Sequence, residues 1–415
     1  MTHARPGLTH VDMNGLATIP AHVPPERVVD FDIYFPPGVE RDYFAAWQAL
    51  QRPGGPALVW TPRNGGHWIA VQGEVVRGLW EDAAHLSNEV LAVPPGLGEV
   101  MRFIPLQLDP PEHGPYRKAV MRGFASQFIV ALEPQVVAVA SELTDGLIGR
   151  GGCEFVEEFA EILPLNIFLT LIGVPLEDRR KLRELGKQLT RPDGSMTVEE
   201  LRQAADDYLE PYVESRLDRP GEDLFSRILS VPLDGRPWTL EEARRMCRNL
   251  LFGGLDTVVA MVGFVALHLA RYPDDQAMLR GDPSLIPAAA DELMRRYASV
   301  SVSRNLVEDV ALDGVTLKTG DVVYLPSVLH NLDPASFEDP EAVRFERKLN
   351  ALRHTTMGGG PHRCVGAGLA RMEIIAFLRE WLGRIPPFRL DPDKPVVMKG
   401  GNVGACTALP LRWDT

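Results

Sequence analysis

The chain has few cysteines, no excess of basic residues and no long hydrophobic run, and each absence excludes a class of protein. Its four cysteines among 415 residues do not form the framework of a disulfide-rich protein, so we expect a reduced, cytoplasmic setting. The net charge of −13 argues against general nucleic-acid binding, which requires a basic surface. The most apolar stretch, Val258–Ala270, is shorter than the roughly 17–25 residues that cross a bilayer. We therefore expect a buried core helix there, and neither a membrane nor a nucleic-acid partner.

The patterns that are present predict one large domain, mainly α-helical with small β-sheets. The composition, 45% hydrophobic and 24% charged, is that of an ordinary globular protein. Helical patterns dominate, strand patterns come in small clusters, and no internal repeat stands out. We expect a single domain over residues 1–415, in which the proline-rich residues 1–40 form an irregular N-terminal arm.

Three local patterns bear on the later argument. Asn64-Gly65 lies between two apolar runs and predicts a hairpin. Asp109 is predicted to cap a helix that carries His113 and Arg117, which lie four residues apart and so share one face. Residues 240–272 predict the longest continuous helix of the chain.

The most informative stretch is the loop from Met357 to Gly366, which reads MGGGPHRCVG. Its glycines permit positive φ and close approach to a planar group, and an apolar helix follows at once. The N-terminus of that helix points its N–H groups at Cys364 and favours the thiolate. This arrangement suggests axial ligation of haem iron. The loop alone leaves three alternatives: a zinc site with His362 and His354, a cysteine nucleophile with His362 as its base, and a plain buried cysteine.

Two further motifs give the loop its context. Gly253-Gly254 interrupts the long predicted helix, where two glycines cost roughly 1–2 kcal/mol relative to alanine, and Asp256-Thr257 follows directly. Glu292 and Arg295 share one face of a later helix. In this order and spacing, the motifs resemble those of the cytochrome P450 family, and the resemblance runs along essentially the whole chain. It is greatest to the bacterial camphor 5-monooxygenase subfamily, in the segments LVWT (58–61), GGHWIA (65–70), TRPDGSMT (190–197), GGLDTVV (253–259) and EWLGRIP (380–386).

The resemblance implies a P450 fold with haem b between the long helix and the cysteine loop. Cys364 would be the proximal iron ligand, with Gly366 in the same cofactor-binding loop. Thr257 would hydrogen-bond dioxygen and help deliver a proton, and Asp256 would admit protons from bulk water. The residues that would pair with the haem carboxylates are His113, Arg117, Arg304 and His362. A buried structural ion network would consist of Glu292, Arg295 and Arg347.

Several neighbours of these residues also follow from the resemblance. Gly253 and Gly254 would let the long helix widen over the haem, and Arg183 and Arg191 would pair with Asp256. Met357 departs from the family, which usually has a phenylalanine at this position. Methionine is flexible and fills similar space, so ligation by Cys364 should survive.

The substrate pocket is where the resemblance to the camphor subfamily fails. Met101 replaces a tyrosine that donates to the camphor ketone, Ala92 a phenylalanine, Asn249 a leucine, Phe252 a valine and Val302 an aspartate. With the donor lost, we expect an apolar terpenoid, such as an ionone-like norisoprenoid, rather than camphor. Asn249 either supplies a replacement polar contact or faces away. The residues expected to line the pocket are Ala92, Met101, Asn249, Phe252, Gly253, Val300, Val302 and Val403.

The resemblance also implies redox partners. A [2Fe–2S] ferredoxin and an FAD-containing, NADH-dependent reductase would supply two electrons. Because ferredoxins are acidic, docking should use a local basic patch, for which Arg117, Lys118, Arg122 and Arg363 are candidates. Two other functions stay open: a peroxide-driven haem-thiolate peroxygenase, against which Asp256 and Thr257 speak, and a non-catalytic haem-binding sensor.

Overall fold

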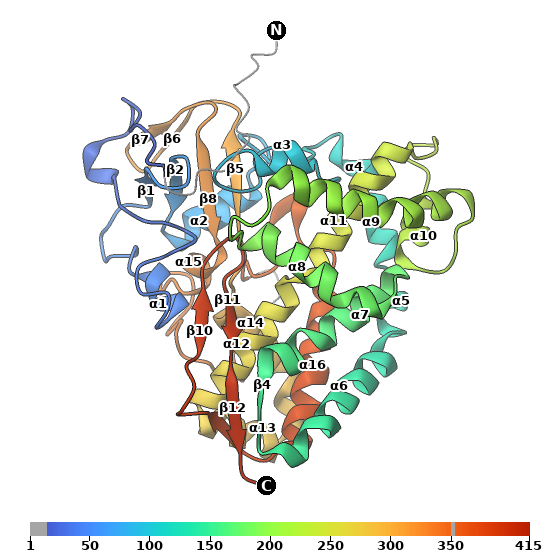
Figure 1. Cartoon of the computed structure of the whole chain (residues 1–415). Helices are drawn as coiled ribbons and strands as arrows, with labels where there is room; N and C mark the ends of the chain where they lie inside the picture. Colours follow the sequence, from blue (N-terminus) through green and yellow to red (C-terminus); the bar gives the residue numbers. More distant parts are fainter. Residues whose placement is uncertain (1–14, 350–352) are drawn as a thin grey trace.

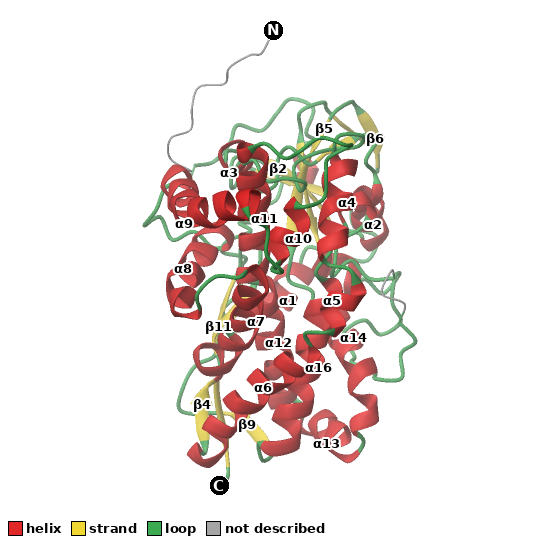
Figure 2. Ribbon diagram, turned by 90° about the vertical axis from the view of Figure 1, so that its right-hand side faces the viewer, coloured by secondary structure: helices red, strands yellow, loops and turns green. Residues whose placement is uncertain are grey.

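The computed structural model describes residues 15–349 and 353–415. Strands gather on one side of the molecule and helices on the other, with α12 and α16 through the middle (Figure 1). A view from the side shows a face made mostly of helices, with the short strands β4 and β9 near the C-terminus (Figure 2). The helices are α1 (Tyr43–Gln48), α2 (Gly73–Glu81), α3 (Leu97–Met101), α4 (His113–Gly123), α5 (Ser126–Val130), α6 (Glu133–Leu147), α7 (Ile162–Ile172), α8 (Arg179–Thr190), α9 (Val198–Asp218), α10 (Leu224–Leu229), α11 (Leu240–Leu255), α12 (Thr257–Arg271), α13 (Pro273–Gly281), α14 (Ile286–Arg296), α15 (Ser327–Asn331) and α16 (Ala367–Arg384).

The strands form four small sheets, so the predicted fold class, mainly α with small β-sheets, is confirmed. The sheets have the strand orders β1-β2-β8-β5-β3, β4-β12-β9, β10-β11 and β6-β7. The strands are β1 (Leu58–Thr61), β2 (His67–Ala70), β3 (Leu86–Ser87), β4 (Gly152–Glu154), β5 (Ser301–Leu306), β6 (Val310–Leu312), β7 (Val315–Leu317), β8 (Val322–Pro326), β9 (Phe388–Leu390), β10 (Val397–Lys399), β11 (Ala405–Ala408) and β12 (Pro410–Trp413).

The predicted hairpin is present in the largest sheet. Strands β1 and β2 pair antiparallel, and the turn places Asn64 at φ 52° and Gly65 at φ 86°. Asparagine and glycine tolerate such positive φ values. Strand β5 lies between β8 and the edge strand β3 of this sheet, and its Arg304 is paired with Val323 of β8. The sheet therefore fixes the strand that presents Arg304 to the site.

The long helix predicted over residues 240–272 is not continuous, and this prediction was wrong. It breaks at Asp256, whose φ of −134° and ψ of −32° lie outside the helical region, and so forms α11 and α12. Thr239 and Glu242 start α11 with a reciprocal capping box, which satisfies two free backbone donors. The break falls on the residue between the glycine pair and Thr257, and it leaves Asp256 free to face other elements.

The capping role predicted for Asp109 was also wrong. Helix α4 begins at His113, and its N-cap Glu112 makes no side-chain cap bond. The Asp109 carboxylate instead accepts from Ser87 Oγ at 2.5 Å and from Asn88 N at 3.0 Å. It ties the loop before α4 to the end of β3, and the start of α4 is placed by this tertiary contact.

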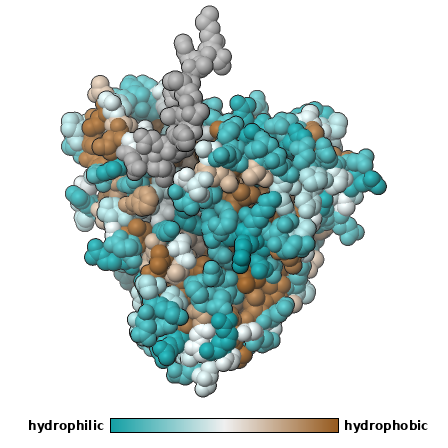
Figure 3. Space-filling view, in the orientation of Figure 1, coloured by the Kyte–Doolittle hydropathy of each residue, from teal (hydrophilic) through white to brown (hydrophobic). Residues whose placement is uncertain are grey.

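The core and the surface match a globular arrangement. One large hydrophobic cluster includes residues from Val23 to Trp413. The single domain over residues 1–415 stays a prediction, because residues 1–14 lie outside the described part of the chain. Taken together, α11 and α12 (Leu240–Arg271) are long and apolar enough to cross a membrane. However, 78% of their most apolar stretch is buried inside the protein. Polar residues cover most of the face over α8 and α9, with hydrophobic residues in smaller groups between them (Figure 3).

Candidate active site

Cys364 lies between a glycine-rich turn and the first turn of α16. Its own N–H donates to the carbonyl of Met357 at 2.8 Å, and the N–H groups of Gly366 and Ala367 interact with its sulfur. Burial raises the pKa of the thiol, while these N–H groups and the charges of Arg117 and Arg363 oppose that rise. The residue as a whole is nevertheless exposed. The helix-terminus setting predicted for Cys364 is present.

The glycines before Cys364 allow close packing against Trp80, a contact that the sequence did not indicate. Gly358 has a φ of 70° and Gly360 a φ of 59°. A Cβ on Gly358 would lie 3.0 Å from the Trp80 ring, and one on Gly360 would lie 3.1 Å from the Trp80 carbonyl. The loop thus packs closely on the end of α2, and the planar group that its backbone approaches is this indole.

Cationic and imidazole side chains gather beside the cysteine loop. The rings of His113 on α4 and His362 lie 4.3 Å apart between centroids, and both Nε2 atoms are buried without a hydrogen-bond partner. Arg304 is buried, lies over the Trp80 ring at 5.2 Å and donates to the carbonyl of Ser303. Burial lowers the pKa of Arg304 to about 10. Arg117 donates to the carbonyl of Arg363.

This cluster fits the carboxylates of haem. A buried guanidinium and unpaired imidazole nitrogens cost free energy unless an acceptor meets them. Within residues 15–349 and 353–415, no carboxylate forms an ion pair with Arg304 or Arg117. An anionic group at this place would receive charge-assisted hydrogen bonds. The predicted residues His113, Arg117, Arg304 and His362 thus lie near one another, as haem binding requires.

Asp256 is the centre of a buried ion network. Its two carboxylate oxygens accept from Arg183 at 2.8 Å, from Arg191 at 2.6 and 2.8 Å, and from the Thr190 hydroxyl at 2.8 Å. Burial alone would raise the pKa of Asp256, but Arg191, Arg183 and Thr190 together lower it below its usual range. Asp256 is thus held as a carboxylate, and the predicted pairing with Arg183 and Arg191 is present.

The same network reaches the surface. Arg183 also donates to Glu161 at 2.9 Å, and both residues line a surface hollow of about 710 Å³. Neither Thr190 nor Glu161 was predicted as a member. Thr190 stands inside the TRPDGSMT segment and could have been found there, whereas nothing in the sequence marks Glu161.

The two glycines before Asp256 have different surroundings. A Cβ on Gly253 would meet nothing within 4 Å, whereas one on Gly254 would lie 2.5 Å from the Phe168 ring. Gly253 therefore faces open space, and Gly254 permits close packing of α11 on α7. Thr257 keeps accessible surface, and its hydroxyl donates to the Gly253 carbonyl at 3.2 Å. Of the pair predicted to make room over the haem, only Gly253 faces a space that could receive a ligand.

The ion network predicted on the cysteine side is present. Glu292 and Arg295 are both fully buried, and Glu292 accepts from Arg295 Nε at 2.8 Å and Nη2 at 2.9 Å. It also accepts from Arg347 Nε at 3.0 Å. Arg295 further donates to the carbonyls of Asn331 and Pro340, each at 2.8 Å. The pair joins α14 to the chain that leads into the cysteine loop, which is a structural role.

Replacing Glu292 with glutamine should destabilise the protein by about 3–5 kcal/mol, because it leaves the buried Arg295 guanidinium without its counter-charge. The midpoint of guanidinium unfolding measures this. Asp291→Asn is the matched control, since Asp291 is the neighbouring residue on α14 and its partly exposed side chain pairs at 2.6 Å with Arg371 on α16. That pair should contribute no more than about 1 kcal/mol. Equal losses in both variants would contradict the structural role of Glu292.

The residues predicted to line the substrate pocket fall into groups. Val300 and Val403 form an antiparallel bridge, and with Ala260 and Ala405 they make a small apolar cluster. The Phe252 ring meets Phe103 edge to face at 5.9 Å. Ala92 is buried, and Val302 is half-buried on β5. These groups are apolar throughout.

Met101 at the end of α3 and Asn249 on α11 lie where these two segments meet. Met101 is fully buried and has no accessible surface. The Asn249 amide nitrogen donates to the carbonyl of Ile104 at 3.1 Å. The amide nitrogen of Asn249 is therefore already used within the protein. This favours the alternative in which Asn249 faces away over the one in which it supplies a polar contact to substrate.

Fold and site together define a haem-thiolate protein. The Cytochrome P450 family model matches residues 191–399. The chain is 34% identical over 407 residues to the probable cytochrome P450 127A1 of Sinorhizobium fredii, covering 95% of this chain and 97% of that protein. It is 30% identical over 382 residues to the cytochrome P450 monooxygenase PikC of Streptomyces venezuelae, covering 90% and 91%.

Two solved structures agree with these sequence matches. The chain is 70% identical to cytochrome P450 CYP101C1, with a TM-score of 0.90, covering 96% of this chain and 100% of that one. It is 40% identical to CYP101J2, with a TM-score of 0.88 and the same coverage. The chain belongs to the cytochrome P450 family. It is a haem-thiolate monooxygenase that binds haem b through a cysteine thiolate.

Proposed function

We propose that this enzyme hydroxylates a small apolar terpenoid, with ionone-like norisoprenoids favoured over camphor, using dioxygen and electrons from a [2Fe–2S] ferredoxin. The observation that carries the proposal is the break at Asp256. It joins a buried carboxylate, paired with two arginines, to Thr257 and to the open side of Gly253. An acid-and-hydroxyl pair beside an apolar pocket suits proton delivery during oxygen cleavage.

The reaction consumes two electrons and two protons. A C–H bond of the substrate and dioxygen give the alcohol and water, while NADH and one further proton supply the electrons and protons. Haem, when bound, would supply the oxygen chemistry, and Cys364 would provide its thiolate ligand. His113, Arg117, Arg304 and His362 would hold the haem carboxylates. Asp256 receives protons on the side of Glu161 and Arg183 and passes them toward the Thr257 hydroxyl.

The pocket supports an apolar substrate. Its proposed walls are aliphatic or aromatic, and the Asn249 amide nitrogen already donates to a protein carbonyl. A ketone that needs a strong hydrogen-bond donor would therefore lose affinity relative to a ligand that relies on apolar contact. Phe252 against Phe103 shapes one wall, and Val300 with Val403 shapes another.

The electron donor would dock on the cysteine side. Lys118 and Arg122 on α4 are exposed, and Arg117 reaches the Arg363 carbonyl beside Cys364. This basic surface suits an acidic ferredoxin, which an FAD-containing, NADH-dependent reductase would reduce in the cytoplasm.

Titration of the haem-loaded enzyme with β-ionone and with camphor tests the substrate. β-Ionone should shift the resting haem spectrum at concentrations at least about tenfold lower than camphor, because neither ketone finds a free donor in this pocket and the larger hydrocarbon skeleton of β-ionone buries more apolar surface. Product analysis with the reconstituted reductase and ferredoxin then checks that binding leads to hydroxylation. Camphor shifting the spectrum as fully as ionones, at equal concentration, would remove the proposed substrate preference.

The same preparation separates the two other functions. Ferredoxin and NADH should give more product than hydrogen peroxide without NADH, and raised salt should slow the ferredoxin reaction, since it screens the docking charges. A peroxygenase would work better with peroxide. A haem sensor would bind carbon monoxide and show no NADH consumption dependent on substrate.

A further inference from the structure

Four side chains on one face of α11 contact a short segment at the end of α3. This segment consists of Met101, the last residue of α3, and the three residues after it, and we call it the 101–104 segment (Met101–Ile104). Arg245, Arg248, Asn249 and Phe252 are spaced three, four and seven residues from the first, so they share one helix face. Three of them donate to backbone carbonyls of the segment, and the fourth meets its aromatic residue. These contacts come from one helix and serve one short segment.

The carbonyls concerned lie where α3 stops. The last carbonyls of a helix have no partner within it, and α3 ends at Met101 because Arg102 turns into the left-handed region at φ 48°. Arg248 donates to the Met101 carbonyl through Nε at 3.0 Å and Nη2 at 2.5 Å. Arg245 Nε donates to the Arg102 carbonyl at 2.6 Å. Asn249 donates to the Ile104 carbonyl at 3.1 Å.

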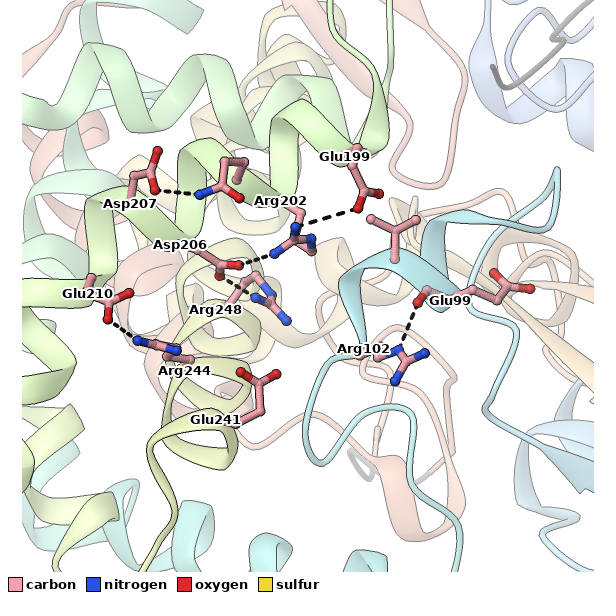
Figure 4. Close-up of a pocket in the computed structure, with 12 residues that line it drawn as sticks. Glu99, Arg102, Glu199, Arg202, Asp206, Asp207, Glu210, Glu241, Arg244 and Arg248 are labelled. Atoms are coloured by element: carbon pink, nitrogen blue, oxygen red, sulfur yellow. Dashed lines mark hydrogen bonds and ion pairs between the residues drawn. The ribbon is translucent and has the colours of Figure 1, made fainter. Parts of the chain in front are cut away.

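Arg248 is the central member because it is buried and charged. It is 3% exposed, and its remaining nitrogen pairs with Asp206 on α9. Asp206 also accepts from Arg202 at 2.7 Å. Figure 4 shows Arg248 and Arg202 both directed at Asp206, at the wall of a polar hollow of about 480 Å³ between α3, α9 and α11. Arg248 thereby links three elements through one guanidinium.

The apolar end of the stripe lies against the same segment. Phe252 meets Phe103 edge to face at 5.9 Å, and Met101, Phe103 and Ile104 are all buried. The next residue of α11, Gly253, faces open space. The segment is therefore held in a fixed register relative to the part of α11 that borders the proposed oxygen site.

We propose that Arg248, supported by Arg245 and Asn249, is a positioning residue that fixes the 101–104 segment as a wall of the substrate pocket and so sets which carbon of the substrate is presented. This rests on the proposed function, since it assumes that the pocket beside Gly253 takes the substrate. Arg248 acts through the segment and does not itself touch the substrate.

The test uses the haem-loaded enzyme and its Arg248→Met variant, which keeps an apolar stem and removes every donor. Hydrogen–deuterium exchange should become about tenfold faster in the peptide over residues 97–106, since charge-assisted hydrogen bonds to the segment are lost. The concentration of β-ionone that gives half the spectral shift should rise about tenfold, and the products should include more positional isomers. Arg248→Lys, which keeps one charged donor, should fall between the two.

Arg244→Met is the matched control. Arg244 lies on α11 and pairs with Glu210 on α9, so it joins the same two helices at the same hollow without a contact to the 101–104 segment among the described residues. It should leave the exchange of this peptide and the product pattern unchanged. An equal effect of Arg244→Met would assign the role to general α9–α11 docking and overturn the proposal.

The readouts separate this inference from the proposed function. If Arg248→Met failed to load haem, Arg248→Lys would carry the test, because it keeps the buried charge. Unchanged exchange in the 97–106 peptide of either loaded variant overturns the positioning role. Faster exchange with unchanged binding and products overturns the link to the pocket. If no terpenoid shifts the spectrum of the wild-type enzyme, the proposed function fails, while the exchange experiment still decides whether Arg248 holds the segment.

Discussion

Replacing Asp256 with asparagine should lower the rate of substrate-dependent NADH consumption by roughly 100-fold, the low end of what a positioned acid or base contributes. Substrate affinity should stay within about twofold, because Asp256 is completely buried and faces Arg183, Arg191 and Thr190. Asparagine has nearly the same shape, but it carries no charge and cannot take up and release a proton. Steady-state turnover and spectral titration measure the two quantities.

A structural disturbance must be distinguished from a lost proton path. The asparagine amide would present N–H groups to Arg191, so the variant should also be somewhat less stable. A solvent deuterium isotope effect on turnover that is larger than in the wild type would report slow proton delivery, which a merely loosened fold does not produce. Asp333→Asn is the control, because Asp333 is another buried aspartate, held by the N–H groups of Gly73 and Ala335. Normal turnover in Asp256→Asn would contradict the relay.

Much of the site could be predicted because its residues lie in short motifs with a local physical reason. The helix that starts three residues later, at Ala367, indicates the role of Cys364, and the preceding glycine pair indicates the roles of Asp256 and Thr257. The buried ion network of Glu292 and Arg295 could be predicted because the two residues share one helix face. These signals are local, whereas the contacts that complete them are not.

The parts that could not be predicted depend on distant partners. Asp109 satisfies every local rule for a helix cap, yet its carboxylate binds Ser87, 22 residues earlier. Arg248 reads as a surface arginine on an amphipathic helix. Its partners are a main-chain carbonyl 147 residues away and a carboxylate 42 residues away. The role of Gly254 depends on Phe168, and nothing in a single sequence shows that pair.

Replacing Thr257 with alanine should separate electron transfer from product formation. The hydroxyl bonds the Gly253 carbonyl at a long 3.2 Å, which leaves it able to turn toward the open side of that glycine. Without it, protons should reach the reduced oxygen without directed delivery, and dioxygen, NADH and a proton would yield hydrogen peroxide and NAD⁺. Product per NADH should fall about tenfold or more, while NADH consumption continues. Parallel assays of NADH, product and peroxide measure the balance.

Thr257→Ser is the matched control, because it keeps the hydroxyl and loses only a methyl group. It should retain most of the product yield, whereas Thr257→Val, which keeps the shape and loses the hydroxyl, should behave like alanine. The three variants therefore separate the hydroxyl from the space that the side chain fills. If alanine and valine form as much product per NADH as the wild type, Thr257 has no part in proton delivery. The break at Asp256 would then serve substrate access alone, since the Gly253 side would stay open.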